Sequence, residues 1–595
     1  MIRFLRSLMA QRDRGIALPL VLGVGMTLSA LLVAGVAYSV GTLDKARSDQ
    51  DWSGALAAAY AAIEEYQSRL ANDTTYFQYG NPASTFSRPF PADPSNIANS
   101  NVTLPTGSAT NAAFGVGVSG TWATVPGSDG TSQFRYEVDN SAYYSSGTLR
   151  LQATGRVGAE TRSIVADLRQ RGFIDFLYFT DYEIQDPQIT GDNVATCVRY
   201  AWAGRPNTGC KEIAFGSNDV VDGPAHSNDI MRVCNARFTR QVTTGYNPAS
   251  ATALLYRPRD SNYNSCTGQV FDLAGQPSRE GVIGMPPTNT QLKRETRSDL
   301  TGVDVPRPGC LYTGPTTIRF NSNGTMTVRS PWTRATNVAG DPATSGTTPA
   351  ACGLPGTGAN QLGSAAGATI TVPANNVVYI QDVPTTAGNP NTWATTAKPT
   401  GITCTTGANG SNGIGFPMAG EATPKAATST NPAYACRKGD VFVQGTLEGQ
   451  VTVAAENYIY ITGNLVYEDR DRDILGLVGN NAVFVWNPTN SWNNRLLTDY
   501  NRTIDAAILS VAHTFQVQNY DEGGDRGELR VYGAIAQKFR GVVRGGTNGY
   551  SKEYVYDDRY VYTAPPKFLS PVTTTYGVSV WIEVSPIFAA DGSYL

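Results

Sequence analysis

The chain has 595 residues and a formal net charge of −3, with 61 glycines, 34 prolines and 30 tyrosines. A chain of this length exceeds what one hydrophobic core supports, so two or three domains are expected. A mildly acidic surface gives no support for nucleic-acid binding. The charged fraction of 16% is low for a cytosolic enzyme, and the Gly-, Pro- and Tyr-rich composition favours short strands and turns over helices.

The chain begins with a short basic leader and a long uncharged run. Four arginines precede Gly15, and no charged side chain follows until Asp44. A run of this length is long enough to cross a bilayer as a helix. An ordinary secretory signal instead has a shorter apolar region that ends in a small-residue cleavage site. Removal of residues 1–15 would take away four arginines and one aspartate, which makes the net charge more negative by three units.

The junction G-I-A-L-P-L, from Gly15 to Leu20, resembles the leader of type IV prepilins. The resemblance implies that a prepilin peptidase cleaves after Gly15 and that Ile16 is methylated. It also implies that the apolar helix is kept, first as a membrane anchor and then in the filament core. Pro19 fits the family, whereas Leu20 stands where major pilins usually carry glutamate. Minor pilins thought to sit at the tip also lack that glutamate. A plain signal anchor is the alternative.

The segment after the apolar run extends the helix. Residues 44–70 are rich in alanine and other strong helix formers, with charges spread through them. Apolar side chains recur at three- and four-residue steps, at Leu56, Ala59, Tyr60, Ile63, Tyr66 and Leu70. The pattern predicts one helix over residues 16–72 whose second half is amphipathic and packs against a globular head.

The next segments predict that head. Residues 73–110 have the composition of a linker or exposed loop. Alternating apolar and polar residues then predict strands over 115–125, 133–138, 148–156 and 162–168. Together with the helix they indicate a pilin-like α+β head over residues 73–187. The aromatic stretch at its end, residues 173–187, is expected to be buried between the head and the following domain.

Residues 188–595 change to short apolar triplets that alternate with Gly or Asn corners, most clearly over 441–485. This spacing predicts a parallel β-solenoid-like domain. Residues 336–367 and 388–427 are expected to be surface insertions. A tyrosine cluster at 550–562, with Asp557 and Arg559 as an ion pair, is expected to form a C-terminal cap. An antiparallel sandwich is the alternative, because alternation alone does not separate the two folds.

Three further segments carry a second resemblance. They are G-P-A-H-S-N-D at 223–229, the rung series at 439–481, and G-A-I-A-Q-K-F-R-G-V-V at 533–543. They resemble a large uncharacterised bacterial family that joins a PilX-like pilin N-terminus to a solenoid and belongs among type IV pilus components. That family has no defined catalytic residues, so the resemblance implies none here.

Eight cysteines lie between Cys197 and Cys436, and none forms a CxxC pair. The spacing disfavours a structural zinc site, and an even number of scattered cysteines in an exported chain indicates disulfides. Pairing of neighbours is one of many connectivities that eight cysteines allow. It would join Cys197 to Cys210, Cys234 to Cys266, Cys310 to Cys352, and Cys404 to Cys436.

Few residues have the pattern of a chemical site. His226 and His513 are the only histidines and stand far apart, and no common hydrolase, metalloprotease or nucleotide-binding motif occurs. No catalytic residue and no cofactor is therefore predicted. Two acidic segments are calcium candidates: residues 468–473, with Asp469, Asp471 and Asp473, and residues 521–528. Interleaved arginines make a solvated, ion-paired loop the simpler interpretation.

These observations predict a structural minor pilin-like subunit of a type IV pilus or related filament. Its N-terminal helix would enter the membrane and then the filament, with the tip as its expected place. The β-rich domain would be displayed outside for adhesion or assembly priming. The expected partners are other pilin subunits, the assembly machinery and the prepilin peptidase, and no nucleic acid. A membrane-anchored carbohydrate-active enzyme and a plain anchored adhesin are the alternatives.

Overall fold

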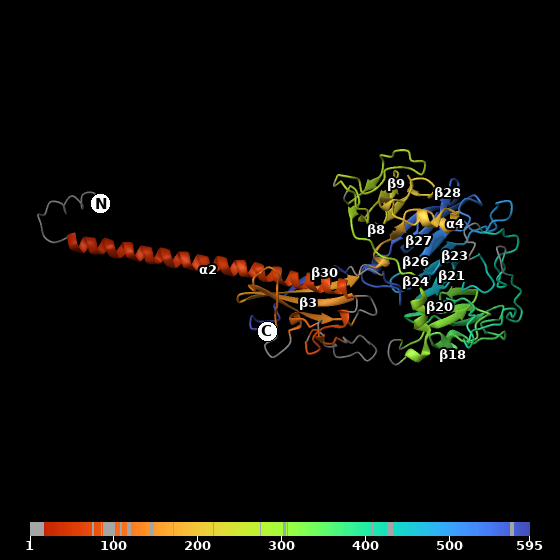
Figure 1. Cartoon of the computed structure of the whole chain (residues 1–595), viewed down its shortest axis with the longest axis horizontal. Coiled ribbons are helices and arrows are strands. Elements are labelled where there is room, and N and C mark those ends of the chain that lie inside the picture. The colour runs from red at the N-terminus through yellow and green to blue at the C-terminus, as the bar shows by residue number, and fades with distance from the viewer. Residues whose placement is uncertain are drawn as a thin grey trace. The chain divides into compact units, whose positions relative to one another are not determined.

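The computed structural model describes residues 17–595, apart from 74–75, 85, 87–101, 108–109, 116–120, 142–147, 171, 218, 251, 274, 302–304, 306, 406–409, 425–431 and 572–575. The chain forms two compact units (Figure 1). Unit 1 comprises Met1–Arg169 and Thr574–Leu595, and unit 2 comprises Gln170–Thr573. The expected fold class, mainly β with one long N-terminal helix, is confirmed.

Unit 1 consists of one helix and a five-stranded sheet. The helix α2 spans Ala17–Asn72. The strand order is β1-β2-β3-β4-β30. The strand bounds are β1 Ala123–Thr124, β2 Ser132–Asp139, β3 Thr148–Val157, β4 Glu160–Gln170 and β30 Tyr576–Val584. Strands β2, β3 and β4 pair antiparallel, and they coincide with three of the predicted strands.

The second half of α2 packs on this sheet. Its buried stripe is formed by Ala59, Ala62, Ile63, Tyr66 and Leu70, which share a core with residues of β2, β3 and β4. Leu56 is half-buried at the edge of that core. The prediction was wrong for Tyr60, which is 41% exposed. Its ring instead lies 5.0 Å from the ring of Trp581 on β30.

Strand β30, from the C-terminal end of the chain, completes the sheet beside β4. Arg162 near the start of β4 donates to Glu583 near the end of β30 at 2.7 Å, and Thr161 donates to the carbonyl of Phe588 at 2.9 Å. The start of one strand therefore lies beside the end of the other, so the two strands run antiparallel. Unit 2 is thus inserted where a hairpin loop would join them.

This insertion changes the expected domain boundaries. The head was expected to span 73–187 and the second domain to reach 595, but unit 1 ends at Arg169 and regains residues from Thr574 onward. The aromatic residues Phe173, Phe176 and Phe179 are buried in a core that includes residues of the unit 2 ladders. They belong to unit 2, because Phe179 lies in strand β5 (Tyr178–Tyr182), which pairs with β27 (Asp525–Phe539) and β8 (Ala225–Ser227).

Unit 2 is built from short strands and a few short helices. The first group is β5 Tyr178–Tyr182, α4 Pro187–Thr190, α5 Val194–Cys197, β6 Ala214–Phe215, β7 Val220–Asp222, β8 Ala225–Ser227, β9 Arg232–Val233, β10 Arg237–Phe238, β11 Val242–Thr244, β12 Val270–Phe271 and β13 Ser278–Arg279. The middle group is β14 Cys310–Thr313, β15 Thr316–Asn321, β16 Thr325–Arg329, β17 Asn337–Gly340, β18 Ala343–Thr347, β19 Ala368–Thr371 and β20 Asn376–Gln381. The last group is β21 Val441–Leu447, β22 Gln450–Ala455, β23 Ile459–Tyr467, β24 Ile474–Gly479, β25 Val483–Val485, β26 Arg502–Val517, β27 Asp525–Phe539, β28 Arg544–Gly545 and β29 Asn548–Tyr556.

Most of these strands stack in two parallel ladders. One ladder runs β14-β20-β22-β24-β26-β27-β5-β8-β11-β13. The other runs through β15, β21, β23, β26, β27, β29, β7, β10 and β12. In register, Leu465, Ile504, Val531, Tyr554 and Val221 form one buried column. Parallel ladders with stacked interior residues are the pairing of a solenoid-like domain and exclude an antiparallel sandwich.

The stack does not follow the order of the chain. The chain enters at β5, extends the stack one way to β12 and β13, and then forms the opposite end with β14 and β15. It returns rung by rung until β27 and β29 pair with β5 and β7. The predicted C-terminal cap is therefore wrong, because β29 lies inside the stack with a neighbour on each side. The Asp557–Arg559 ion pair does form, at 2.7 Å.

One predicted surface insertion is partly integrated. Phe416 stacks on Phe442 with ring centroids 3.8 Å apart, and Phe442 stacks on Tyr460 at 4.8 Å. Tyr434, Trp486 and Phe484 complete this aromatic cluster. The segment around Phe416 therefore covers an apolar face of the strands, which a solvated excursion would leave exposed.

Candidate membrane and assembly helix

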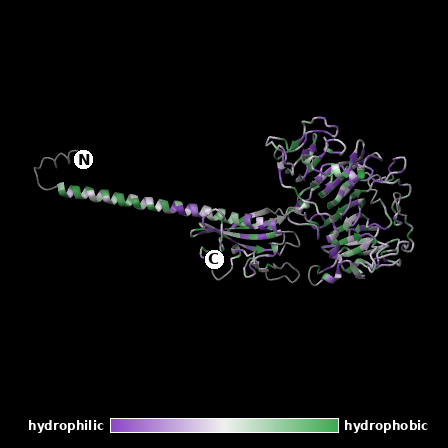
Figure 2. Cartoon of the chain, in the orientation of Figure 1, coloured by the Kyte–Doolittle hydropathy of each residue, from purple (hydrophilic) through white to green (hydrophobic). Residues whose placement is uncertain are grey.

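The first part of α2 presents apolar side chains on all sides. The large apolar residues from Leu18 to Leu43 are between 50% and 76% exposed, and Figure 2 shows this part of the helix as predominantly hydrophobic. By length and composition, α2 can cross a membrane, and it is the single such helix in the described part of the chain. A surface of this kind is not stable in water and requires lipid or another apolar helix.

The polar residues within this part of α2 are internally bonded. The hydroxyl of Thr27 donates to the carbonyl of Gly23 at 3.0 Å, and that of Ser39 donates to Gly35 at 2.8 Å. Thr42 donates to Ser39 at 2.9 Å. Because each hydroxyl donates to a carbonyl of the preceding turn, it needs no water molecule as a partner. The segment is therefore compatible with a lipid or protein interior.

The predicted processing residues fall at the boundary of the described chain. Gly15 and Ile16 lie outside the described residues. Pro19 and Leu20 lie in the first turn of α2, where proline fits because no preceding turn is disrupted. Leu20 is 65% exposed and is an apolar surface residue of the helix.

A polar network fixes the far end of α2 to the head. The phenol of Tyr136 on β2 donates to Glu65 at 3.0 Å, and Asn111 donates to Tyr76 at 3.2 Å. Asn111 also donates to Tyr136. Burial raises the pKa of Tyr136 well above its ordinary value, so the phenol stays a donor. The charged face of the helix is thereby tied to the sheet, while the apolar part remains exposed.

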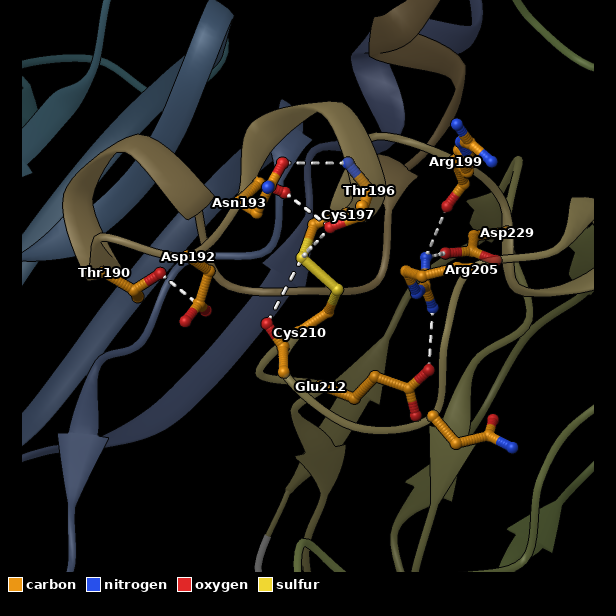
Figure 3. Close-up of a disulfide and its surroundings, with 12 residues drawn as sticks. Thr190, Asp192, Asn193, Thr196, Cys197, Arg199, Arg205, Cys210, Glu212 and Asp229 are labelled. Carbon is orange, nitrogen blue, oxygen red and sulfur yellow. Dashed lines mark hydrogen bonds and ion pairs between the residues drawn. A yellow bond between two sulfur atoms is a disulfide. The ribbon is translucent and has the colours of Figure 1, made fainter.

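The four disulfides join Cys197–Cys210, Cys234–Cys266, Cys310–Cys352 and Cys404–Cys436. This is the neighbour pairing considered from the sequence. Figure 3 shows the first of them beside the loop that carries Arg205 and Glu212. All four lie in unit 2. Each closes a short stretch of chain, which restricts the unfolded state and pre-orders the loops of that unit.

The acidic loop does not assemble a calcium site. Asp473 accepts from the backbone nitrogens of Gly449 and Asp469 at 2.8 and 2.7 Å. Asp469 pairs with Arg472 at 2.6 Å, and Asp471 donates its own backbone nitrogen to Asp469. Across the described residues, no group of three or more His, Cys, Asp or Glu side chains is arranged to hold a metal ion. The carboxylates of this loop order the turn between β23 and β24.

Both histidines are buried in separate hydrogen-bond networks. His226 contacts the Thr243 hydroxyl at 2.8 Å and the Asn228 side chain at 3.0 Å. His513 contacts Asp186 at 2.5 Å. His226 lies within strand β8, where its ring bonds to Thr243 on the neighbouring strand β11 and is part of the interior of the stack. The contact between His513 and Asp186 could not be predicted from the sequence, because the two residues are 327 positions apart.

Sequence reasoning also missed the buried ion pairs of unit 2. Arg540 donates to Glu183 at 3.0 Å, and both side chains are at most 3% exposed. The two residues meet because β27 pairs with β5 across the closing point of the stack. No local signal marks such a contact, since the partners are separated by 357 positions.

Comparisons with known proteins give little further information. No family model matches the chain, and no curated protein matches it. Among solved structures, the chain is similar to the competence-associated pilin ComZ from Thermus thermophilus, with a TM-score of 0.25 and 11% sequence identity over 90% of this chain and 98% of that chain. A likeness at this level carries no argument about fold or role. The interpretation of the chain therefore rests on its own helix and head.

Proposed function

We propose that the chain is a minor pilin-like subunit of a type IV filament. Its N-terminal helix anchors it in the cytoplasmic membrane after leader cleavage and then packs among the helices of other subunits. Unit 2 is carried on the cell surface or the filament, where it serves adhesion or assembly priming rather than catalysis.

The division of α2 into two halves is the observation that carries this proposal. One continuous helix is apolar and exposed up to Leu43, and from Ala55 onward one face of it is buried against its own sheet. A plain anchor needs no rigid connection between membrane and head, whereas a filament subunit needs one to transmit position along the assembly. The leader junction at Gly15 and the proline at Pro19 support the same interpretation.

The insertion of unit 2 supports a low copy number. Unit 2 spans Gln170–Thr573 and interrupts the head between β4 and β30. A regular filament repeats its subunits at close spacing, and an insertion larger than the head is accommodated most readily at the tip. Leu20 in place of glutamate agrees with that position.

The mass of the mature N-terminus tests the proposal in membrane and sheared-filament fractions. We expect a chain that begins at methylated Ile16 and is present in the filament fraction. The matched variant is Gly15→Val, which blocks cleavage in the proposed scheme while leaving α2 intact. It should remain in the membrane with residues 1–15 attached. A wild-type chain that retains Met1 and never enters filaments would leave an anchored adhesin or an anchored surface enzyme.

A further inference from the structure

A shallow pocket of about 440 Å³ opens on the surface of unit 2. It is lined by Asn207, Thr208, Arg257, Arg259 and Tyr263. Two disulfides hold the segments that carry these residues. Cys197–Cys210 closes the segment of Asn207 and Thr208, and Cys234–Cys266 closes the segment of the other three. The lining is therefore pre-ordered, which lowers the entropy cost of binding.

A network of arginines lies beneath one wall of the pocket. Glu212 accepts from Arg205 at 2.8 Å and from Arg257 at 3.1 Å, and it also pairs with Arg232. Arg205 pairs in addition with Asp229, as Figure 3 shows. Burial raises the pKa of Glu212, but the three arginines outweigh it and hold the pKa below its ordinary value. Two carboxylates, those of Glu212 and Asp229, thus pair with the three guanidinium groups of Arg205, Arg232 and Arg257.

The mouth of the pocket carries a further cation and an aromatic ring. Arg259 is exposed and donates to the carbonyl of Tyr263 at 2.8 Å, and no carboxylate in the described chain pairs with it. The guanidinium of Arg232 lies 4.0 Å from the centroid of the Tyr263 ring, and the Tyr263 phenol donates to the carbonyl of Asn207 at 2.7 Å. Tyr263 is nevertheless 40% exposed. The Tyr263 ring is therefore held in place beside the exposed guanidinium group of Arg259.

The backbone at Tyr263 is itself unusual. Its φ of 66° lies in the left-handed region, which a large side chain rarely adopts. Such strain persists only where surrounding contacts hold it, and it is frequent at binding sites. Here the bond from Arg259 holds the Tyr263 carbonyl, while Asn207 and Arg232 hold its side chain at the edge of the pocket.

We propose that this pocket binds the carboxylate of an acidic sugar. The planar guanidinium groups of Arg257 and Arg259 match a carboxylate in geometry and charge. The amide of Asn207 and the hydroxyl of Thr208 suit sugar hydroxyl groups, and the Tyr263 ring offers an amphipathic surface to a sugar ring. The volume lies in the range of small-molecule sites. Binding of a nucleic acid would instead require an extended track of cations.

The proposal deepens the display role of unit 2 and rests on that proposed function, because it names the ligand class of the displayed unit. The test is isothermal titration of the full-length chain in detergent at low salt, with trigalacturonate as the probe and neutral galactotriose as its control. We expect binding of the acidic sugar only. Arg259→Gln should weaken it about tenfold or more, since a charge-assisted hydrogen bond is lost.

Arg472→Gln is the matched control variant. Arg472 is another exposed arginine of unit 2, pairs with Asp469 and lies outside the lining of the pocket. Its replacement should leave the affinity for trigalacturonate unchanged. Equal weakening by Arg472→Gln would mean that only the overall charge matters and would overturn the proposal. Equal binding of galactotriose would do the same, as would tighter binding of a single-stranded DNA oligonucleotide at the same residues.

Filament incorporation of the same variants separates this inference from the proposed function. A wild-type chain that enters filaments but does not bind trigalacturonate would overturn the ligand proposal and keep the pilin role. A chain that binds the sugar through Arg259 but never enters filaments would keep the site and overturn the pilin role.

Discussion

The backbone of Gly155 on β3 lies directly against the backbone of Ala55 on α2. A Cβ atom at residue 155 would stand 2.0 Å from the Ala55 carbonyl oxygen and 2.4 Å from the backbone nitrogen of Ala59. Both neighbours are main-chain atoms of a helix, so a side-chain rearrangement does not relieve the contact. The absence of a side chain at residue 155 therefore lets the helix rest on the sheet at this distance.

Gly155→Val is expected to loosen α2 from the head. Overpacking of a core costs about 1 to 3 kcal/mol, and a clash with backbone falls at the upper end of that range. The measurement is hydrogen exchange of the full-length chain followed by mass spectrometry. Amides of β2, β3 and residues 55–70 should lose protection, while unit 2 should remain unchanged.

Gly41→Ala is the control for this prediction. It adds a methyl group to an exposed turn of α2, where no atom lies within 4 Å of the added Cβ. Its exchange pattern should equal that of the wild type. Unchanged protection in Gly155→Val would contradict the close packing of helix and strand.

Removal of unit 2 is expected to leave a folded head. Strands β4 and β30 are neighbours and run antiparallel, so a short turn can join them. We expect a chain in which a four-residue Gly/Asn turn replaces residues 172–574 to keep α2 and the five-stranded sheet. Circular dichroism and exchange protection of β2–β4 would measure this. Loss of protection throughout the sheet would show that the head needs unit 2 to fold.

Arginine in the centre of the apolar segment is expected to prevent membrane insertion. Leu31 is 69% exposed, and a charged residue at the centre of a membrane helix costs about 2.5 to 3.5 kcal/mol on insertion-based scales. Leu31→Arg should shift the chain out of the membrane fraction. Ser53→Arg, on the exposed side of the helix near the head, should stay in it. Equal fractionation of both variants would argue against a membrane role for this segment.

The stability of unit 2 is expected to fall between acidic and neutral pH. Burial raises the pKa of Glu421 to about 7, although Tyr434 and the Met418 backbone nitrogen donate to its carboxylate. The folded state therefore keeps a proton that the unfolded state releases near pH 4.3, the ordinary value for glutamate. The contribution of Glu421 to the free energy of unfolding is therefore largest below that pH. It declines as the pH rises and is lowest once the pH passes about 7.

Glu421→Gln should reduce this dependence, because the amide does not ionise. The expected loss for Glu421 between pH 4 and pH 8 is on the order of 3 kcal/mol. Urea unfolding of unit 2 at pH 4 and pH 8 would measure it. Asp440, whose pKa burial also raises to about 7, contributes in the same direction, so part of the slope should remain. A wild-type midpoint that rises with pH would contradict the prediction.

Phe416→Ala is expected to release the loop that covers the aromatic cluster. Phe416 is half-buried and stacks on Phe442. Loss of a buried phenylalanine costs about 3 to 5 kcal/mol, and partial burial reduces that figure. Limited proteolysis should cut residues 405–424 faster than in the wild type. The control is Trp492→Ala, because Trp492 is 82% exposed and should leave the cleavage rate unchanged.

The sequence predicted the elements of this fold better than their connections. The apolar run and alanine-rich segment predicted α2 to within a residue, because a helix is encoded by local spacing. The apolar triplets at 441–485 predicted parallel rungs, since each corner carries Gly or Asn. In contrast, the place of β30 beside β4 depends on contacts across more than 400 positions, and no local pattern records it.

The candidate sites show the same limit. Cysteine pairing and the Asp557–Arg559 pair are short-range, and both appear in the structure. The shared carboxylate of Glu212 brings together arginines from three separate segments. The pocket above it became visible only after the disulfide-closed loops were placed. The C-terminal cap failed as a prediction because the chain closes its stack in the middle.

The antiparallel neighbours β4 and β30 also determine how mechanical load passes through the protein. Any pulling force applied to unit 2 reaches the head through both connections at once, so each covalent connection carries a share of it. From β4 the force passes to β3 and into α2, which Gly155 holds at backbone contact. Two connections to the head therefore divide an applied load between two strands, whereas a single linker would place all of it on one.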